Sequence, residues 1–260
     1  MLSLLLATAE AIGSEIAPLA RQYEVRPDPT LRAAHEADML AEAVALDVLT
    51  SADVRVLSEE AGWVGNGLIQ VVLDPIDGTE NLTRGIPYSG PSIWAQNEDG
   101  ICVGVVSNVF TGHNFWAVTA SGAFRDGEQL NLVGSPGPGL LIVGGQHRPL
   151  SGIFGRDLGA TAHSLCAVAE GRLAGYRTPS HCPDRSWDLM AGLLIAKEAG
   201  CRVRSIEGGK DPMHDPLSDN RVVVAPRLLF RHLWSLSPSL PGVRNVDEVL
   251  DDPFGADTPP

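Results

Sequence analysis

Apolar and polar positions repeat with two different periods along this chain, and the first to appear is the helical one. In residues 2–23 apolar side chains recur every three to four positions up to the turn-rich RPDPT, which predicts an amphipathic helix. Residues 31–49 are rich in alanine and leucine and contain neither glycine nor proline. They predict a second helix, so the chain is expected to open with a helical pair.

The middle of the chain changes to the shorter period of β-strands. VRVL predicts a short strand, and LIQVVL predicts a buried one because it is β-branched and uncharged. Four further strand-like segments follow, separated by Gly, Asp and Asn turns: PSIWAQNEDG, ICVGVVSNVF, HNFWAVTASG and AFRDGEQL. Their spacing predicts an antiparallel meander.

The character changes again at GSPGPGL, residues 134–140, which we interpret as a junction between two halves. Beyond it the pattern predicts strands in LLIVGG, CRVRSI and RVVVA, and helices in ATAHSLCAVAEG and DLMAGLLIAKEAG, the latter ending at Gly200. We therefore predict a layered α/β (α+β) sandwich with halves 1–133 and 134–246. Residues 247–260 contain prolines, acids and no apolar period, which predicts a disordered tail.

The composition indicates a hydrophobic core and an excess of acidic residues. The 260 residues are 44% hydrophobic and 20% charged, as in ordinary globular proteins. Nineteen Lys and Arg stand against 32 Asp and Glu, for a formal charge of −13. This balance argues against nonspecific nucleic-acid binding, which needs a basic surface. An anionic substrate stays compatible with it, because bound divalent cations invert the local field.

Four widely spaced cysteines without a C-x-x-C motif argue against a zinc site or a disulfide framework. Reduced thiols fit a cytoplasmic location, which we expect. The opening MLSLLLATAEAIG lacks a basic flank and continues as an Ala-rich helix, so we expect no signal peptide. We also expect no apolar stretch long enough to span a membrane.

Two aspartates surround a proline directly after the buried strand, in VVLDPIDGTENL. Pro75 cannot donate a ladder hydrogen bond and Gly78 frees the backbone to turn, so Asp74 and Asp77 are expected at a strand end. Such ends carry function in many folds. An isolated D-P-x-D-G is equally typical of an Asp-rich turn.

Other acidic residues favour a functional site over a simple Asp-rich turn. Glu59 and Glu60 close the preceding short strand, Asp188 begins a predicted helix, and Asp38 lies inside the second helix. Each has an ordinary role when taken alone: a helix cap for Asp188 and a solvated position for the others. Together they predict a site for two hard cations, which prefer carboxylate and carbonyl oxygens. The helix start after Gly78 offers N–H groups to a phosphate oxygen, so the pattern favours phosphoryl transfer.

These motifs resemble the inositol monophosphatase family of magnesium-dependent, lithium-sensitive phosphatases. The matching segments are EADMLAE, LSEEAG, VVLDPIDGTENL, GAFRDGEQL, GATAHSLCAVAEGR and SWDLMAGLLIAKEAG. D-P-I-D-G-T with a downstream W-D-x-x-x-G and E-A-G is highly specific. The resemblance implies an α-β-α-β-α sandwich of the inositol monophosphatase and fructose-1,6-bisphosphatase type, and a homodimer.

By the same resemblance, Glu59, Asp74 and the main-chain carbonyl of Ile76 would hold a first Mg²⁺. Asp74 would bridge to a second ion completed by Asp77 and Asp188, and a third, weaker ion would also use Glu59, giving two to three ions.

The resemblance assigns the phosphate contacts to the backbone N–H groups of Gly78 and Thr79. Asp38 and Thr79, with Glu59, would orient and deprotonate the attacking water. The carrier of the phosphate would lie against Gly159, Ala160, Thr161 and Ala162 and against the 176–188 loop.

That loop departs from the family pattern. Members acting on inositol phosphate carry a glutamate seven residues before the W-D aspartate, and it binds ring hydroxyls. Counting back from Asp188 gives His181, and counting forward from Tyr176 gives Thr178. Because Asp184 is the only acid nearby, we predict that it replaces the missing glutamate and that inositol 1-phosphate is at best a modest substrate. Upstream, Arg26 and His35 replace a family lysine and threonine.

The resulting hypothesis is a magnesium-dependent phosphatase acting on a phosphate monoester of a small polyol, cyclitol or sugar. A nucleotidase acting on 3′-phosphoadenosine 5′-phosphate and a catalytically idle binding relative stay open as alternatives. Haloacid-dehalogenase-type phosphatases carry D-x-D-G-T, with one residue between the acids instead of two, and their motif lies near the start of the chain.

Overall fold

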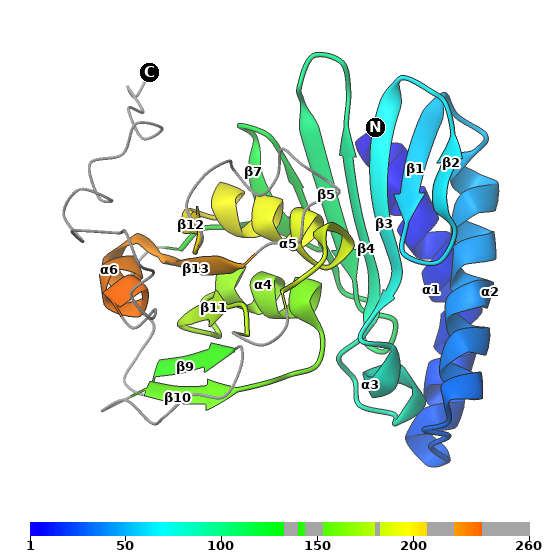
Figure 1. Ribbon diagram of the computed structural model, residues 1–260, viewed down its shortest axis with the longest axis horizontal. Coiled ribbons are helices and arrows are strands. Elements are labelled where there is room, and N and C mark those ends of the chain that lie inside the picture. The colour runs from blue at the N-terminus through cyan, green and yellow to red at the C-terminus, as the bar shows by residue number, and fades with distance from the viewer. Residues whose placement is uncertain (133–139, 144–152, 180–182, 207–220, 236–260) are drawn as a thin grey trace.

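The computed structural model describes residues 1–132, 140–143, 153–179, 183–206 and 221–235, which build alternating layers of helices and sheets (Figure 1). A helical pair covers one face of a first sheet, two further helices fill the space between this sheet and a second one, and a last helix packs on the far side of the second sheet. This order of layers confirms the predicted α-β-α-β-α sandwich.

The outer helical layer consists of α1 (Leu2–Val25) and α2 (Leu31–Leu49). Both helices were expected from the sequence, and α1 continues two residues past its predicted end. α2 begins at Thr30, whose hydroxyl accepts a hydrogen bond from the Ala33 N–H at 3.2 Å. A buried alanine every fourth position along α2 lets it approach α1 closely: Ala33, Ala37, Ala41 and Ala45.

α1 is long and apolar enough, by length and composition alone, to cross a membrane. The expectation that no stretch could do so is therefore wrong for this helix. Its apolar face contributes Leu5, Ile12 and Ile16, all 0% exposed, to the core beneath the first sheet. Core helices and N-terminal signal sequences share this composition.

The first sheet has eight strands in the order β2-β1-β3-β4-β5-β6-β7-β8. Their bounds are β1 (Val54–Ser58), β2 (Gly62–Gly65), β3 (Ile69–Asp77), β4 (Gly90–Gln96), β5 (Cys102–Ser107), β6 (Asn114–Val118), β7 (Gly122–Arg125) and β8 (Glu128–Leu130). From β3 to β8 all neighbours are antiparallel, as the meander prediction requires. The unpredicted β2 turns the chain back, so β1 pairs with β3 in parallel.

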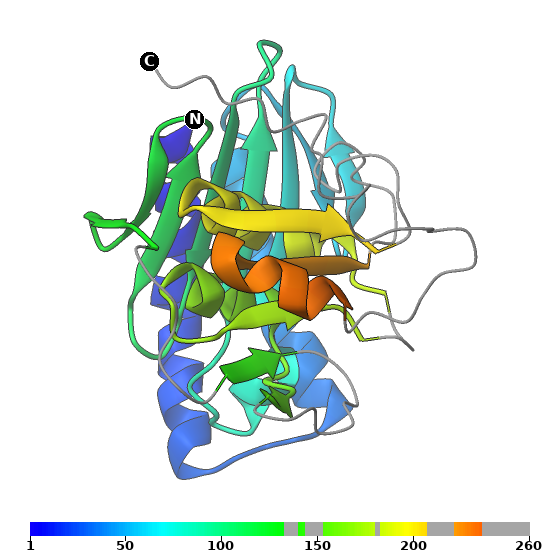
Figure 2. The same ribbon diagram turned by 90° about the vertical axis from the view of Figure 1, so that its left-hand side faces the viewer.

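The second sheet has five strands in the order β10-β9-β11-β13-β12. Its strands and the associated helices are β9 (Leu140–Val143), β10 (Ile153–Arg156), α4 (Thr161–Ala169), β11 (Gly175–Arg177), α5 (Ser186–Glu198), β12 (Cys201–Ser205), β13 (Val222–Pro226) and α6 (Arg227–Ser235). Figure 2 shows α6 and this sheet in front of the helical layer. β10, β11 and α6 were not predicted from the sequence.

Several predictions fall on residues outside the described part of the chain. They are the junction at 134–140 except for its last residue, the end of LLIVGG, His181 in the 176–188 loop, and the tail 247–260. The division into halves 1–133 and 134–246 therefore stays a prediction, although the first sheet ends at Leu130 and the second begins at Leu140.

α5 lies at the centre of the molecule, between the two sheets. Every residue from Leu189 to Ala196 is buried, so the helix is apolar on all sides, as expected for one enclosed by protein. It packs against β4 and β5 of the first sheet and against β12 of the second. This position brings the first turn of α5, and the acid in it, to the end of β3.

Candidate active site

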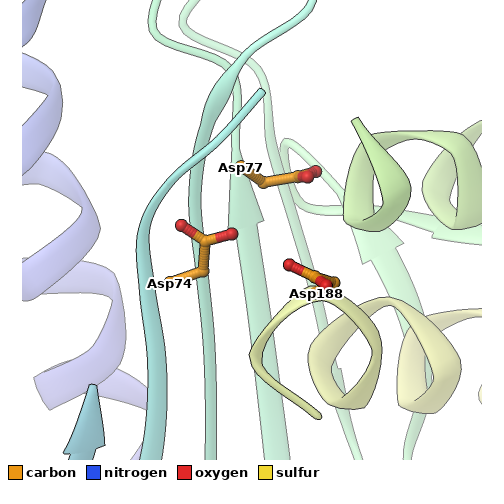
Figure 3. Close-up of side chains that lie close together, drawn as sticks. All are labelled: Asp74, Asp77 and Asp188. Carbon is orange, nitrogen blue, oxygen red and sulfur yellow. The ribbon is translucent and has the colours of Figure 1, made fainter. Parts of the chain in front are cut away.

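Three aspartates from two distant segments meet where β3 ends and α5 begins. Carboxylate oxygens of Asp74, Asp77 and Asp188 lie within 4.8 Å of one another. Figure 3 shows the three carboxyl groups facing a common space between the β3 chain and the start of α5. Asp74 and Asp77 are 2% and 4% exposed, so this space is a buried concentration of negative charge.

An irregular register in β3 explains how Asp74 and Asp77 face the same space. Residues three apart on a regular strand point to opposite faces. Asp74 pairs with Ser92 and Asp77 with Gly90, so β3 has one more residue than β4 between these pairs, and Pro75 lies inside this bulge. The extra residue re-aims the second side chain. The strand thus continues to Asp77, and the proline marks the bulge instead of the strand's last residue.

Asp74 and Glu59 are adjacent in the structure. The Asp74 Oδ1 accepts a hydrogen bond from the Ile76 N–H at 2.9 Å, and the Glu59 side chain hydrogen-bonds to that of Asp74. The loop that carries Glu59 is held by Glu42, whose Oε1 accepts a hydrogen bond from the Ala61 N–H at 3.0 Å. Glu42 is buried one turn after Asp38, and sequence reasoning gave it no role.

Asp188 combines a cap with a place in the acid cluster. It lies in the first turn of α5, and its Oδ2 accepts a hydrogen bond from the Arg185 N–H at 2.9 Å. The helix start is also fixed to the first sheet, because the Ser92 hydroxyl donates to the Trp187 carbonyl at 2.8 Å. The ordinary capping role of Asp188 and its convergence with the strand acids therefore hold together.

Asp77 caps α4 from across the layer. The helix begins after Ala160, which has no side-chain acceptor. In its place the Asp77 Oδ1 accepts from the Thr161 N–H at 2.9 Å, and Oδ2 accepts from the His163 N–H at 3.1 Å. The His163 Nδ1 lies 3.0 Å from the same Oδ2. His163 was not expected at the site, and its only signal is a polar residue in an apolar helix.

Burial and mutual repulsion raise the pKa values of Asp74, Asp188 and Glu59. Burial, and then the charges of Glu59, Asp77 and Asp188, raises the pKa of Asp74 well above its usual value. Burial and the charge of Asp77 raise the pKa of Asp188 to about 8. Burial also raises the pKa of Glu59, although its hydrogen bond with Asp74 opposes the shift. All the donor atoms in this cluster are oxygens, and their negative charge is buried. A hard divalent cation such as Mg²⁺ fits such a site.

Asp38 and Thr79 form a second pair beside the acids. The Thr79 Oγ1 lies 2.9 Å from the Asp38 Oδ1 and 3.0 Å from the Ile76 carbonyl oxygen. A hydroxyl has one proton, so it donates fully to one of them at a time. Burial raises the pKa of Asp38 to about 7, although the Thr79 hydrogen bond lowers it in part.

Gly78, which precedes Thr79, begins α3 (Thr79–Thr83) in the left-handed region with φ 84°. A Cβ at this position would lie 2.9 Å from the Ala160 Cβ and 3.0 Å from the Tyr88 carbonyl oxygen. Glycine is therefore required both by the backbone angle and by the close approach of the 159–160 segment. Asn81 ties the same segments together, since its side-chain amide donates to the carbonyls of Tyr88 at 2.9 Å and Leu158 at 2.8 Å.

These groups line one cavity of about 420 Å³. Its walls are Glu59, Asp74, Ile76, Asp77, Gly78, Thr79, Asp157, Gly159, Ala160, Thr161, Ser164, Tyr176, Pro179, Asp184 and Asp188. Asp38 touches the site through Thr79. Ala162 does not line the cavity, because it is fully buried in the core around Leu165. Asp157 was missed by sequence reasoning, and it lies exposed at this wall.

Asp184 lies in the cavity wall and is fixed by three hydroxyl groups. Its Oδ2 accepts from Tyr176 at 2.8 Å and Thr178 at 2.5 Å, and its Oδ1 accepts from Thr161 at 3.2 Å. Thr178 is the residue found by counting forward to the family's glutamate, and its hydroxyl donates to Asp184, so an acid lies beside that position. Burial raises the pKa of Asp184, although the three hydrogen bonds oppose the shift.

A larger hollow of about 710 Å³ lies elsewhere on the first sheet, around Arg55, Trp63 and Gln70. It has no cluster of acids in the part of the chain that the structure describes. The 420 Å³ cavity is therefore the candidate active site.

Comparison with known proteins identifies the family to which this chain is similar. The model of the Inositol monophosphatase family matches residues 6–239. A fructose-1,6-bisphosphatase/inositol-1-monophosphatase from Archaeoglobus fulgidus is 33% identical over 180 residues, which cover 66% of this chain and 70% of the relative. A Nus factor SuhB from Pasteurella multocida is 28% identical over 267 residues, which cover 92% of this chain and 97% of the relative.

Among solved structures, the extragenic suppressor protein suhB from Bartonella henselae superposes with a TM-score of 0.74 at 25% identity. The superposition covers 90% of this chain and 96% of the suppressor protein. The likeness extends over both sheets, so the layered fold is shared across its length.

Proposed function

Because this chain belongs to the inositol monophosphatase family, we propose that it hydrolyses phosphate monoesters of small polyols, cyclitols or sugars with Mg²⁺. The observation that carries the proposal is the arrangement around one cavity. Three converging aspartates and Glu59 stand at one side, and the Thr79–Asp38 pair stands next to them. An oxygen-rich, buried anionic cluster beside a hydroxyl–carboxylate pair is suited to phosphoryl transfer to water.

We propose two cations at this site. Glu59, Asp74 and the Ile76 carbonyl would hold the first, and Asp74, Asp77 and Asp188 would hold the second. Bound Mg²⁺ supplies positive charge that polarises the phosphate and makes water a better nucleophile. Asp74 and Asp188 need that charge, because burial and the repulsion of neighbouring carboxylates raise their pKa values in its absence.

Thr79 and Asp38 are proposed to orient and activate the attacking water. When Asp38 is ionised, the Thr79 hydroxyl donates to it, and a lone pair of the Thr79 oxygen is left to accept a hydrogen bond from water. A pKa of about 7 for Asp38 suits a group that accepts a proton at neutral pH. Phosphate oxygens would lie against the backbone of Gly78 and Thr79, where glycine keeps the wall free of a side chain.

The remaining wall of the cavity favours a neutral carrier. Besides the acid cluster, the described walls contain Asp157, Asp184 and the hydroxyls of Thr161 and Tyr176, and no Lys or Arg from the described residues lines the cavity. A second phosphate on the carrier would meet like charge there, so monophosphates are favoured over bisphosphates. Three of the roughly four acceptor positions of the Asp184 carboxylate are already used, which leaves one for a substrate hydroxyl.

The test is Mg²⁺-dependent phosphate release measured across a panel. The panel contains inositol 1-phosphate, sugar monophosphates, fructose 1,6-bisphosphate, nucleoside monophosphates and 3′-phosphoadenosine 5′-phosphate. We expect release that chelation abolishes, highest with a neutral polyol or sugar monophosphate and modest with inositol 1-phosphate. A clear preference for 3′-phosphoadenosine 5′-phosphate would transfer the assignment to the nucleotidase alternative.

A non-catalytic binding role is the second candidate, because the Pasteurella relative that matches 92% of this chain is a Nus factor. Phosphate release from no member of the panel, with Mg²⁺ or Mn²⁺ and a protein that still binds Mn²⁺, would favour it. The homodimer and the cytoplasmic location remain part of the proposal, and sedimentation and cell fractionation test them.

A further inference from the structure

Asp77 receives three hydrogen-bond donors from the first turn of α4. Its Oδ1 accepts from the Thr161 N–H, and its Oδ2 accepts from both the His163 N–H and the His163 Nδ1. The two side chains are 5% and 3% exposed, so water does not compete for these positions. An ionised carboxylate only accepts, so with Asp77 ionised the His163 Nδ1–H is the donor in this contact.

Counting acceptor positions shows what these contacts leave for a cation. A carboxylate offers about four lone-pair positions, two on each oxygen. Oδ2 uses both of its positions for His163, and Oδ1 uses one for Thr161. One position is left, on Oδ1. We propose that His163 is a positioning residue that, within the function proposed above, holds Asp77 so that Oδ1 alone faces the second cation.

The imidazole is not needed to start the helix. The backbone N–H groups of Thr161 and His163 already donate to Asp77, and they would do so with any side chain at position 163. The ring also carries a cost, because its Nε2 is buried without a hydrogen-bond partner in the part of the chain that the structure describes. Leucine at this position would avoid that cost.

What the imidazole adds is therefore the third donor to Asp77. Its ring lies against Tyr88, with centroids 5.4 Å apart and an interplanar angle of 54°, so neighbouring side chains restrict its rotation. Donors that orient a metal-binding side chain commonly set metal affinity. Here the donor fixes which oxygen of Asp77 is available.

Two nearly isosteric variants separate this role from simple packing. In His163→Asn the side-chain amide can donate from the place of Nδ1, whereas His163→Leu has a similar size and no donor. Mn²⁺ is the probe, and its binding is followed by the loss of the free-ion electron paramagnetic resonance signal, without substrate. We expect the asparagine variant to bind within about threefold of wild type and the leucine variant to bind one Mn²⁺ about tenfold more weakly.

Thermal unfolding of the ion-free proteins is the second readout. Leucine buries no unpartnered nitrogen, so we expect the ion-free His163→Leu protein to melt no lower than wild type. The Mg²⁺ concentration for half-maximal activity should rise in the leucine variant, with little change in the KM for substrate. His163→Met, flexible and apolar, replaces the leucine variant if that protein does not fold.

Equal Mn²⁺ binding by wild type and both variants would overturn the proposal. A parallel fall in Mn²⁺ affinity and in ion-free melting temperature in both variants would also overturn it, because it would show a packing role. A wild-type protein that binds no Mn²⁺ would instead remove the cation site itself, and with it the proposed function. The two failures are therefore distinguishable.

Discussion

Two parts of the active-site cavity wall, the cation end around Asp74, Asp77 and Asp188 and the carrier end around Asp184, are held mainly by different kinds of hydrogen bonds. At the cation end, main-chain N–H groups hold all three aspartates, and the His163 imidazole adds a side-chain donor to Asp77. At the carrier end, side-chain hydroxyls of Thr161, Tyr176 and Thr178 hold Asp184. The main-chain hydrogen bonds depend on the bulge in β3 and the starts of α4 and α5, and not on the side chains of the donor residues.

This difference indicates that substrate specificity can change while the residues of the reaction chemistry stay the same. A main-chain donor survives most substitutions, so the acid cluster persists as long as the fold does. A hydroxyl donor disappears with one substitution, such as threonine to valine, so the carrier end can change one residue at a time. A site built to hydrogen-bond a hydroxyl also discriminates strongly between substrates. We expect relatives with the same cluster to differ mainly at the carrier end.

The largest effect is expected at the cation end, from Asp74→Asn. Asp74 would contact both cations, so its loss removes a shared ligand from the site. We expect Mg²⁺-dependent turnover to fall about a hundredfold or more while the protein stays folded. Asp99→Asn, an exposed position in the β4–β5 loop, is the matched control and should keep full activity. Phosphate release and circular dichroism measure the two properties, and residual activity above about a tenth of wild type counts against the assignment.

The second-largest effect is expected from a backbone change at Gly78, in the cavity wall where phosphate is proposed to bind. Gly78→Ala forces a side chain into a φ of 84° and within 2.9 Å of the Ala160 Cβ, so the 78–79 and 159–160 segments must separate. We expect kcat/KM to fall about tenfold or more, since small displacements of positioning groups are costly. Gly112→Ala also has a positive φ, of 72°, but open space around it, and it should leave kcat/KM unchanged.

Specificity should respond at the carrier end. Asp184→Ala removes the acid there, and Thr178→Val removes one of its three hydroxyl donors. We expect both variants to lower kcat/KM for the best polyol phosphate, the alanine variant about tenfold and the valine variant less. Turnover of a simple alkyl phosphate, which has no hydroxyls to bind, should stay nearly constant. If inositol 1-phosphate is clearly the best substrate and Asp184→Ala leaves its kcat/KM unchanged, the hypothesis that Asp184 replaces the family's glutamate is wrong.

Lithium probes the cation end without mutation. The resemblance to the family implies inhibition by Li⁺, which would take the place of the second cation and trap product. Because Asp77 and Asp188 are present, we expect uncompetitive inhibition at about millimolar Li⁺. Steady-state kinetics at several substrate concentrations measure the pattern. Full activity at tens of millimolar Li⁺ would indicate a different second site.

The smallest effect is a dependence of stability on pH. In the unfolded chain aspartates ionise near pH 4, whereas folding without cations raises the pKa of Asp38 to about 7 and of Asp188 to about 8. The folded state then binds more protons, so its stability is full below pH 4 and falls as the pH rises through 7 and 8. Added Mg²⁺ should therefore raise the melting temperature more at pH 8 than at pH 5.5. A shift of equal size at both pH values would contradict this linkage.

Sequence reasoning reached the cation end more completely than the carrier end. Asp74, Asp77 and Asp188 stand in motifs whose spacing predicts a buried strand, a turn and a helix start. The contact between His163 and Asp77 joins residues 86 positions apart, and no local pattern predicts it. Asp184 was found as the nearest acid, but its three hydroxyl partners come from the start of α4 and the end of β11, which only the fold brings together.

The missed elements have similar causes. β2, β10 and β11 contain three or four residues, too few to establish a period. The parallel pairing of β1 with β3 depends on β2, so it could not be predicted without that strand. α6 is different, because RLLFRHLW has apolar positions at helical spacing, so this helix could have been predicted from the sequence.

The proposed function depends most on the acids at the end of β3 and the start of α5 binding divalent cations together. Crystals grown with Mn²⁺ and phosphate, measured at the manganese absorption edge, test it most directly. We predict anomalous peaks between Asp74, Asp77, Asp188 and Glu59, with phosphate against Gly78 and Thr79. Anomalous density absent from this cluster at saturating Mn²⁺, or found only elsewhere on the molecule, would contradict the account.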